Sequence, residues 1–506
     1  MDIHDQSAAI AFLSAPETYG ETGAVKIIET HISLVFLIDG RAYKLKRAVK
    51  LPYVDFSTYD LRLHYCRREV ELNSRATPDL YLGIRRITRE ADGRVAFDGE
   101  GEALDVVVEM NRFAQHDLFD RMATEGRLDA PLMRQTAAMI AAVHAAAPVV
   151  HAGSGSANMA GVLDINEAGF ATSHVFATDA VSHLTDAFRR SWADQVALMD
   201  RRETENKVRL CHGDLHLRNL YISPAGPRMF DCIDFNDQIA TVDVLYDLAF
   251  LLMDLWQRGF ADFANIVVNR YLDISRDDDG FVLLPFFMAV RAAVRAHVTG
   301  TQIEEGADAQ GPLAQSARVY FEFAASLLVP GAPRLVAIGG LSGSGKSTLA
   351  DALAPRLAGP PGGRILESDR IRKAMFGADP DERLPLDAYR SEVSRKVYQE
   401  LVERARLILS GGGAVLVDAV FDRPEDRDAI QSVAEELSVP FTGIWLDADP
   451  SLLMARVQSR PQGASDATVD VLQAQLAKDL GPMRWNRVDS AGPIDTVLAA
   501  IEAHLA

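Results

Sequence analysis

The sequence predicts a two-domain protein in which an α+β domain precedes an α/β domain with a parallel sheet. Two apolar segments that alternate in polarity flank Asp39-Gly40, as in a β-hairpin. Helical periodicity dominates from Asp117 onward, which indicates a helical lobe after a small antiparallel sheet. Much later, an apolar run at 335–339 leads through a glycine-rich turn into a helix. Strand, turn and helix in that order are typical of an α/β domain.

Composition limits the function classes. A chain of 506 residues is too long for one ordinary core, and 48% hydrophobic with 24% charged residues is usual for a globular protein. The net charge of −19 argues against nucleic acid or an anionic membrane as the main partner. The three cysteines show no metal-binding spacing and are expected to be reduced. No secretory signal or long apolar span stands out, so we expect a cytoplasmic protein. The sequence predicts no oligomeric state.

Proline and glycine divide the chain near its middle. They interrupt helical periodicity at 329–333, just before the apolar run at 335–339. We therefore expect a first domain at 1–328, a linker at 329–333 and a second domain at 334–506. The elements expected in the first domain are a helix at 7–14, strands at 34–38 and 41–46, a helix that includes 65–73, a strand at 80–87, an antiparallel pair at 95–97 and 103–110, and helices at 131–147, 180–200 and 242–259.

A loop motif in the first domain carries chemistry. In the segment His212-Gly213-Asp214-Leu215-His216-Leu217-Arg218-Asn219, a carboxylate and an amide stand five residues apart. The carboxylate of Asp214 can accept or orient a hydroxyl, and the amide of Asn219 can ligate Mg²⁺. A strand is expected at 229–235, and it ends in Asp234-Phe235, where a second metal carboxylate belongs. His212 and His216 are an unlikely metal pair because no third ligand is evident.

These elements resemble the HGDxxxxN and IDF motifs of the aminoglycoside phosphotransferase and choline kinase superfamily. The resemblance implies a bilobal protein-kinase-like fold for the N-terminal domain. It makes Asp214 the catalytic aspartate and makes Asn219 and Asp234 metal ligands, with Asp231 as the second choice for Asp234. Asp243 and Asp247 match the acidic segment that follows these motifs in the family.

The same resemblance implies a lysine that contacts the α- and β-phosphates and a glutamate that pairs with it. Lys44 and Lys46 are both candidates, because alternation places them on one face of a strand. Glu69 is the candidate partner, with Glu71 as the alternative. Glu109 and Met110 would lie at the hinge that holds adenine. No GxGxxG loop is present, since residues 29–33 stand in its place; a degenerate, non-catalytic kinase fold is therefore the alternative.

The strongest motif is Gly340-Leu341-Ser342-Gly343-Ser344-Gly345-Lys346-Ser347, between an apolar strand and a helix. This is the context of a P-loop, whose backbone N–H groups and following helix N-terminus bind phosphate. Lys346 would contact the β- and γ-phosphates, and the hydroxyl of Ser347 would hold Mg²⁺. The predicted ATP-binding residues of this P-loop NTPase domain are Gly340, Ser342, Gly343, Ser344, Gly345, Lys346, Ser347 and Thr348.

Asp369 ends an expected short strand at 364–369, and a helix with Arg372 follows. This spacing resembles the DxxR element of small P-loop kinases such as the polynucleotide kinase, zeta-toxin and gluconate kinase groups. The resemblance implies that Asp369 acts as base or orienter at the acceptor hydroxyl, while Arg372 binds substrate or phosphate. The alternative is an N-cap aspartate before a basic helix face.

Further along, Asp418 ends a buried strand at 414–418, in a Walker B-like position where a carboxylate orients Mg²⁺ through water. After another strand at 441–446, Arg456 and Arg460 resemble the lid arginines of such kinases, although two solvated helix arginines would give the same pattern. Arg427 is a weaker candidate for substrate contact.

The whole chain resembles a bacterial fusion of an aminoglycoside phosphotransferase-like domain with a P-loop predicted kinase. It implies two ATP sites and an ATP- and Mg²⁺-dependent phosphotransferase that acts on a hydroxyl of a small molecule. The alternative is a P-loop ATPase switch joined to a pseudokinase domain that only binds. A third possibility, a toxin-like kinase for a nucleotide-sugar or a nucleic-acid end, conflicts with the acidic charge balance.

Overall fold

The computed structural model describes residues 5–51, 54–151, 153–304, 311–378, 382–459 and 465–505. The chain forms two compact units. Unit 1 comprises Met1–Asn158 and Met199–Leu251, and unit 2 comprises Met159–Leu198 and Leu252–Ala506. Helices from the expected first domain therefore belong to the same unit as the expected second domain. The boundary at 329–333 stays a prediction; these residues follow helix α11 (Pro312–Leu327) without regular structure.

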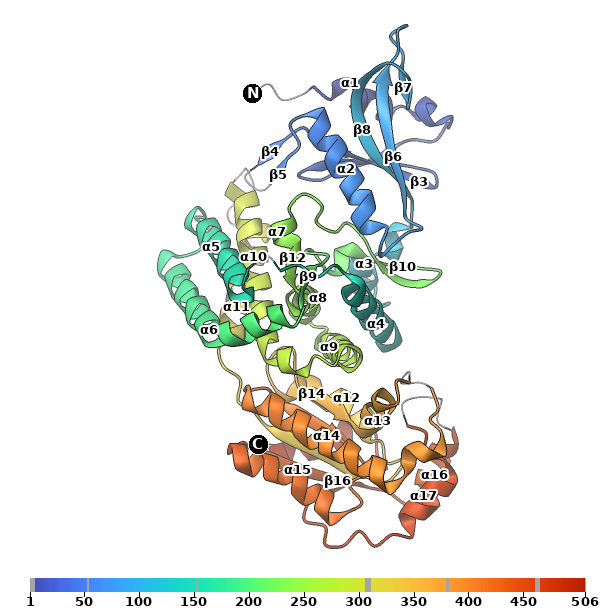
Figure 1. Cartoon of the computed structure of the whole chain (residues 1–506), viewed down its shortest axis with the longest axis vertical. Helices are drawn as coiled ribbons and strands as arrows, with labels where there is room; N and C mark the ends of the chain where they lie inside the picture. Colours follow the sequence, from blue (N-terminus) through green and yellow to red (C-terminus); the bar gives the residue numbers. More distant parts are fainter. Residues whose placement is uncertain are drawn as a thin grey trace. The chain divides into compact units, whose positions relative to one another are not determined.

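Unit 1 is organised around an antiparallel sheet with helix α2 (Tyr59–Asn73) against it (Figure 1). The side chain of Thr58 caps α2 by accepting a hydrogen bond from Leu61 N. Alternation along the central strand supplies both faces: Val106 and Val108 pack on the α2 side, and Val107 packs on the side of α1 (Ser7–Ser14). The sheet order is β1 (Lys26–Glu29), β2 (Ser33–Ile38), β3 (Arg41–Lys46), β8 (Glu102–Asn111), β6 (Tyr81–Arg89) and β7 (Val95–Phe97).

Two expectations about strands are wrong. β7 pairs with β6 and not with β8, because residues 90–94 form a tight turn that folds β7 back on its neighbour in sequence. β8 instead lies between β3 and β6. The expected strand at 229–235 is also absent: β11 (Gly226–Met229) ends where the expected strand would begin. Asp231 has a φ of +62°, which a continuing strand does not adopt.

The rest of unit 1 carries the loop motif. β9 (Val208–Leu210) pairs with β12 (Thr241–Asp243), and β10 (Leu220–Ser223) pairs with β11. The motif 212–219 thus connects two short ribbons. The other elements that lie wholly in unit 1 are α3 (Phe119–Thr124), α4 (Ala130–Ala146), α7 (Asp237–Ala240), β4 (Lys50–Leu51) and β5 (Val54–Asp55). Three helices are divided between the two units: α5 (Gly155–Ala171), α6 (Thr178–Thr204) and α8 (Val244–Gln257).

Besides Met159–Leu198, unit 2 contains helices α9 (Ala261–Ser275), α10 (Leu284–Glu304) and α11, of which α10 and α11 pack together. One segment of the described chain, Asp278–Ile303, is long and apolar enough by composition to cross a membrane. However, 67% of its most apolar window is buried inside the protein, as is usual for the core helix of a globular fold.

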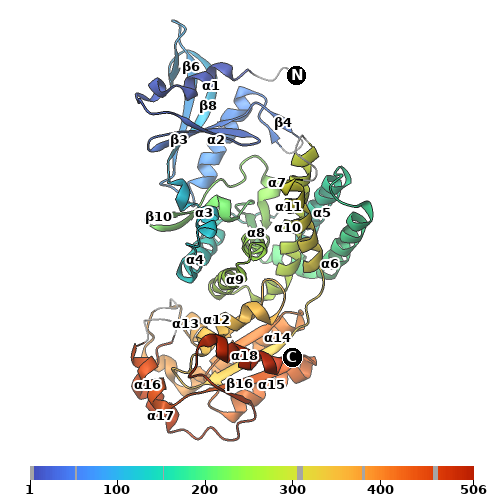
Figure 2. The ribbon, with the colours of Figure 1, turned by 180° about the vertical axis from the view of Figure 1, so that it is seen from behind.

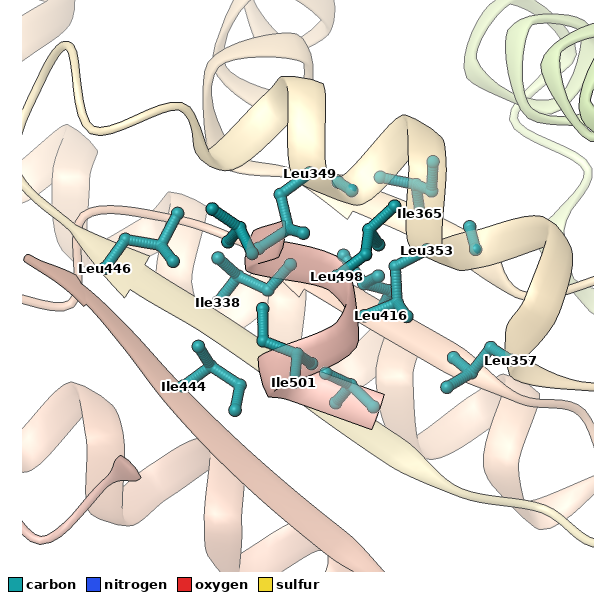
Figure 3. Close-up of a cluster of buried hydrophobic side chains, with 14 of the residues drawn as sticks. Ile338, Leu349, Leu353, Leu357, Ile365, Leu416, Ile444, Leu446, Leu498 and Ile501 are labelled. Carbon is teal, nitrogen blue, oxygen red and sulfur yellow. The ribbon is translucent and has the colours of Figure 1, made fainter. Parts of the chain in front are cut away.

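The second layer of unit 2 is a parallel sheet with helices on both faces (Figures 1 and 2). α12 (Lys346–Leu357) and α18 (Ile494–Leu505) cover one face, where Ile338, Leu353 and Ile501 meet in the core (Figure 3). α14 (Ser391–Ser410) and α15 (Pro424–Leu437) cover the other. The sheet order is β14 (Arg364–Glu367), β15 (Val415–Asp418), β13 (Leu335–Gly340), β16 (Phe441–Asp447) and β17 (Asn486–Asp489), and the smaller helices are α13 (Ser368–Met375), α16 (Pro450–Ser459) and α17 (Val469–Leu476).

Candidate functional site

The glycine-rich loop of unit 2 lies between β13 and α12, and its shape depends on glycine. φ is +84° at Gly343 and +91° at Gly345. A Cβ atom on Gly343 would also lie 2.6 Å from the carbonyl oxygen of Leu453, which is closer than real Cβ contacts. α12 begins at Lys346, directly after the loop. The first N–H groups of α12 have no partners within the helix, so the loop and the helix end can together bind an anion.

A pocket of about 950 Å³ lies at this loop. It unites most of the residues that the sequence predicts for the second domain. Gly340 ends β13 and is not part of the lining, and Arg460 lies outside the described residues. The predicted residues in the lining are Ser342, Gly343, Ser344, Gly345, Lys346, Ser347, Thr348, Asp369, Arg372, Asp418 and Arg456.

Arg427 does not belong to this lining, and its expected substrate contact is wrong. Its guanidinium donates to the carbonyl oxygens of Phe421 and Leu480 at 2.7 Å each and to Pro482 at 3.1 Å. Only 3% of the residue is exposed. A buried guanidinium with three carbonyl partners holds chain segments together and has little capacity left for a ligand.

Two carboxylates and a hydroxyl meet at the start of α12. Ser347 Oγ lies 2.7 Å from Asp418 Oδ2 and 3.4 Å from Glu367 Oε1. Burial raises the pKa of Asp418, against the opposing charge of Lys346. Burial likewise raises the pKa of Glu367 to about 7, although the guanidinium of Arg370 lowers it. Hard oxygen donors of this kind fit a divalent cation, which would restore the charged form of both carboxylates.

Glu367 was not singled out by the sequence. The register of the sheet explains its position, because Glu367 and Asp418 are paired residues at the carboxyl ends of the parallel strands β14 and β15. Ligands in open α/β sheets bind at these strand ends. The signal that could have found Glu367 is its place at the end of a short apolar strand, two residues before Asp369.

The acceptor side of the pocket is formed by α13 and the segment after it. Asp369 lies in the first turn of α13 and is half-buried. It does not end the strand, as expected from the sequence, because α13 already begins at Ser368. Arg372 donates to the carbonyl oxygen of Ala388 at 2.8 Å and lies over the ring of Tyr389. Within the described part of the chain, the buried Arg372 Nε has no hydrogen-bond acceptor. Arg456 donates to the Ser490 carbonyl oxygen at 2.9 Å.

Unit 1 holds a second cluster of charged groups, centred on Glu69. Lys44 Nζ and Lys46 Nζ donate to the two carboxylate oxygens of Glu69, at 2.8 Å and 2.7 Å. Lys44 also pairs with Asp231 at 2.5 Å, and Lys46 with Asp234 at 2.6 Å. Both strand lysines therefore contact the helix glutamate, and the two aspartates divide between them. The alternative partner Glu71 is exposed and pairs with Arg75.

Opposite charges offset part or all of the cost of burial in this cluster. Burial raises the pKa of Glu69, but the two neighbouring ammonium groups outweigh it and hold the value at about 2. Burial lowers the pKa of Lys46, but the carboxylates of Glu69 and Asp234 reverse this and raise it overall. The pKa of Asp234 is raised by its burial, although Lys46 lowers it. An isolated charge at this depth would be costly, so the cluster is stable only as a whole.

The loop motif is held in place by its own polar groups. Asn219 Nδ2 donates to the main-chain oxygen of Asp214 at 2.9 Å and to Asp214 Oδ2 at 3.0 Å. His216 Nε2 lies 3.3 Å from the same carboxylate, whose side chain is 40% exposed. His212 Nε2 lies 2.9 Å from the main-chain oxygen of Phe230, and burial lowers the pKa of His212. The two histidines therefore brace the loop, and their contacts do not form a metal site.

The carboxylate of Asp247 binds main-chain amides of the loop motif 212–219. This carboxylate accepts hydrogen bonds from His212 N at 3.2 Å and Gly213 N at 2.8 Å, and it lies 3.1 Å from His144 Nε2. His144, Cys211 and Asp247 form a buried group of potential metal ligands within 4.8 Å of one another, but the amides already occupy the carboxylate. Arg202 donates two hydrogen bonds to the carboxylate of Asp243, from Nε at 2.7 Å and from Nη2 at 2.9 Å. His144 and Arg202 were missed because their partners are remote in sequence.

The structure places Glu109 and Met110 inside β8, not in a connecting segment. Glu109 is in register with Tyr43 of β3 and with Gly83 of β6. Its carboxylate contacts Tyr43 Oη at 3.1 Å, and Met110 packs in the α2-side core. The connection out of the sheet begins after Asn111, where β8 ends. Glu109 and Met110 therefore lie within the strand, and their expected role in holding adenine stays a prediction.

Two family models match the chain. Residues 97–281 match the family described as "Phosphotransferase enzyme family", and residues 335–479 match the family described as "AAA domain". The two matched regions do not overlap. The N-terminal region is kinase-like, the C-terminal region is a P-loop kinase domain, and the protein is an ATP-dependent kinase.

Relatives extend over most of the chain. An uncharacterized protein of Mycobacterium tuberculosis (strain ATCC 25618 / H37Rv) is 28% identical over 486 residues, which is 93% of either chain. An adenylyl-sulfate kinase of Myxococcus xanthus is 31% identical over 117 residues, 23% of this chain and 59% of the relative. Among solved structures, a choline/ethanolamine kinase family protein from Mesorhizobium loti covers 63% of this chain and 94% of its own, with 13% identity and a TM-score of 0.41. A gluconokinase from Sinorhizobium meliloti 1021 covers 34% and 91%, with 24% identity and a TM-score of 0.26.

Kinases of these families use ATP with a divalent metal and act on small molecules. The oxygens of Ser347, Asp418 and Glu367 fit such a metal at the P-loop, because two carboxylates converge there on one hydroxyl. The cluster of unit 1 differs: the Asp234 carboxylate is already bound by Lys46, and Asn219 Nδ2 is directed at Asp214. As arranged, these residues do not fit a divalent cation at Asp234.

Proposed function

We propose that the P-loop pocket transfers the γ-phosphoryl group of ATP to a hydroxyl of a small molecule, and that the cluster of unit 1 belongs to a second nucleotide site. One observation carries the first part. A phosphate-binding loop, a carboxylate at the acceptor side and a buried arginine line a single pocket, through Lys346, Asp369 and Arg372. These are the groups that phosphoryl transfer requires, because the protein mainly positions the reactants and neutralises charge.

The roles follow from position. The P-loop amides and Lys346 hold the β- and γ-phosphates. Ser347, Asp418 and Glu367 would hold Mg²⁺, which would supply positive charge against the phosphates. Asp369 accepts or orients the proton of the acceptor hydroxyl as its oxygen bonds to the γ-phosphorus and ADP leaves. Arg372 and Arg456 neutralise charge on the transferred group.

The lining favours an acceptor that carries an anionic group. Arg383 and Arg423 line the same pocket as Arg372, and among the described residues neither guanidinium takes part in a hydrogen bond or ion pair. Arginine forks bind carboxylate or phosphate in two-point contacts. The pocket size suits a small molecule better than a polymer, and the acidic chain as a whole disfavours nucleic acid. We therefore propose that the substrate is a small hydroxyl compound with an anionic group, and that the enzyme is cytoplasmic.

For unit 1 we propose that Asp214 acts at an acceptor hydroxyl if this site is catalytic, and that Lys44 contacts the nucleotide phosphates. The exposure of the Asp214 and Asp231 side chains, at 40% and 46%, supports access from solvent. The second candidate function is a pseudokinase domain that binds nucleotide beside an active P-loop kinase. The pairing of Lys46 with Asp234 favours it, because this pairing occupies the carboxylate that phosphoryl transfer would use for metal.

The test is product formation from ATP and a pool of small hydroxy-acids and sugar phosphates, detected as a mass gain of one phosphate. The full chain is compared with Lys346→Ala, Asp369→Asn and Asp214→Asn. Asp495→Asn is the matched control for Asp369, because both lie in the first turn of a helix of the P-loop domain and Asp495 is outside the pocket. Product that persists at the wild-type rate in Lys346→Ala and in Asp369→Asn would overturn the proposal. Loss of product only in Asp214→Asn would assign transfer to unit 1.

A further inference from the structure

Two lysines share one glutamate in unit 1, and they differ in access. The outer pair is Lys44 with Asp231, whose side chains are 14% and 46% exposed. The inner pair is Lys46 with Asp234, whose side chains are 2% and 6% exposed. Glu69, at 1% exposed, joins the pairs through its two oxygens. An incoming phosphate can therefore reach Lys44 without disturbing Lys46.

The inner pair is fixed from several sides. Lys46 Nζ lies 5.0 Å from the centre of the Phe56 ring, an arrangement that favours the ammonium. Asn73 Oδ1 accepts a hydrogen bond from Cys232 N at 3.0 Å, and Asn73 Nδ2 donates to the main-chain oxygen of Glu69 at 2.9 Å. The segment that carries Asp234 is thereby attached to the helix that carries Glu69. Lys46 cannot leave Asp234 without losing one of its two carboxylate partners in a buried position.

From these contacts we propose that Lys46 is a built-in counter-cation of Asp234, so that unit 1 binds a nucleotide polyphosphate through Lys44 without a divalent cation at Asp234. This rests on the proposed second nucleotide site. A divalent cation at Asp234 would lie within a few ångströms of the Lys46 ammonium in a buried environment, where like charges repel strongly. Because it is part of the chain, the Lys46 ammonium lies beside Asp234 without a binding step, and it shares its single positive charge between Asp234 and Glu69.

The consequence is that the two nucleotide sites differ in metal requirement. At the P-loop, the oxygens of Ser347, Asp418 and Glu367 converge, with the charge of Lys346 acting on Asp418 and Arg370 paired with Glu367 at 2.6 Å. There, removal of divalent cations should weaken nucleotide binding. In unit 1, removal of divalent cations should not weaken nucleotide binding.

The experiment measures binding of a fluorescent N-methylanthraniloyl-ATP to the full chain, with Mg²⁺ or with EDTA. The Lys346→Ala background silences the P-loop, and adding Lys44→Ala identifies the signal that belongs to unit 1. We expect the unit 1 dissociation constants with Mg²⁺ and with EDTA to agree within about threefold. A loss of about tenfold or more in EDTA, or no Lys44-dependent binding under either condition, would overturn the proposal. Binding to the P-loop, measured in the Lys44→Ala background, shows separately whether the proposed kinase site holds.

A substitution of Lys46 should produce a gain of metal binding, which a merely structural role of Lys46 would not explain. Lys46→Gln should leave Asp234 free for a cation, so the Lys346→Ala, Lys46→Gln chain should bind more Mn²⁺ by electron paramagnetic resonance than Lys346→Ala alone. Lys46→Arg keeps the positive charge and should not bind the additional ion. Near-UV circular dichroism checks that each variant is folded. If Lys46→Gln folds but binds no additional Mn²⁺, the proposal is contradicted. If Lys46→Gln does not fold, the comparison of nucleotide binding with Mg²⁺ and with EDTA, in the chain that keeps Lys46, still tests the proposal.

Discussion

Arg364 Nε and Asp278 Oδ1 lie 2.7 Å apart, and both side chains are almost completely buried. Arg364 belongs to β14, the edge strand of the parallel sheet, and Asp278 follows helix α9. The same guanidinium contacts Asp273 at 2.8 Å, and Asn269 Oδ1 accepts a hydrogen bond from Ile365 N at 2.7 Å. α9 therefore covers the open edge of the sheet and satisfies its main-chain groups. An uncovered edge would expose these groups to pairing with other chains.

This contact predicts that Arg364→Leu strongly destabilises unit 2. The substitution removes one arginine partner from Asp278 and one from Asp273, while Arg404 and Arg370 still contact them at 3.2 and 3.6 Å. We expect a loss of up to about 3–5 kcal/mol of unfolding free energy, the cost of a buried charge left without any partner. Arg356→Leu is the matched control, because Arg356 pairs with Glu502 at 3.2 Å on the surface, and exposed pairs contribute about 0–1 kcal/mol. Urea unfolding followed by circular dichroism measures both. Equal midpoints for the two variants would show that the buried pair does not stabilise the unit.

Gly343→Ala should abolish nucleotide binding at the P-loop. The new Cβ would lie 2.6 Å from the Leu453 carbonyl oxygen, so the loop would have to move. We expect a loss of affinity of about tenfold or more for N-methylanthraniloyl-ATP in the Lys44→Ala background. Gly412→Ala separates this effect from backbone strain, because Gly412 has a φ of +89° but open space where its Cβ would lie. Similar losses in both variants would refute the steric explanation.

Glu367→Gln and Asp418→Asn should raise the Mg²⁺ concentration needed for half-maximal turnover. Both carboxylates contact the Ser347 hydroxyl, and losing a charged oxygen near the cation weakens its binding by about 10–100-fold. Titration of Mg²⁺ at saturating ATP measures the change. Glu392→Gln, on the exposed first turn of α14, is the control. An unchanged Mg²⁺ midpoint in both variants would remove these residues from the metal site.

Unit 2 should lose stability as the pH falls from 6.5 toward 4. Burial lowers the pKa of His297 from 6.5 to about 4, so the folded state keeps the imidazole neutral where the unfolded chain takes up a proton. The free energy of unfolding then falls with pH through this window, by roughly 3 kcal/mol in total, and the loss is absent above it.

The matched variants test that dependence directly. His297 Nε2 lies 3.1 Å from Asn166 Oδ1, and His297→Gln keeps a donor for this oxygen while removing the titration. The melting temperature of His297→Gln should therefore decrease less between pH 7 and pH 5 than that of the wild type. His183→Gln, at an exposed position of α6, should behave like the wild type. Parallel decreases in all three proteins would assign the effect to other groups.

Local pattern was sufficient for much of this chain. The hairpin at 34–46 follows from Asp39-Gly40 and alternation, and the P-loop follows from glycines between an apolar strand and a helix. Those features depend on neighbours in sequence, so spacing alone identifies them. The strand at 229–235 failed for the opposite reason. Its apolar residues suit a strand, but its segment is held by the distant Asn73 and turns at Asp231.

From the sequence alone we predicted the P-loop motif, the loop motif at 212–219, a division into two domains and many, but not all, of the residues that the structure brings together. Only the tertiary structure decided how charges are shared: Glu69 binds both lysines, Lys46 occupies Asp234, and Glu367 joins Asp418 across two parallel strands. It also decided that α9 completes the sheet edge through Arg364. The physical reason is that buried ion pairs and strand register join residues far apart in the chain, and their energies depend on burial and distance that spacing does not encode.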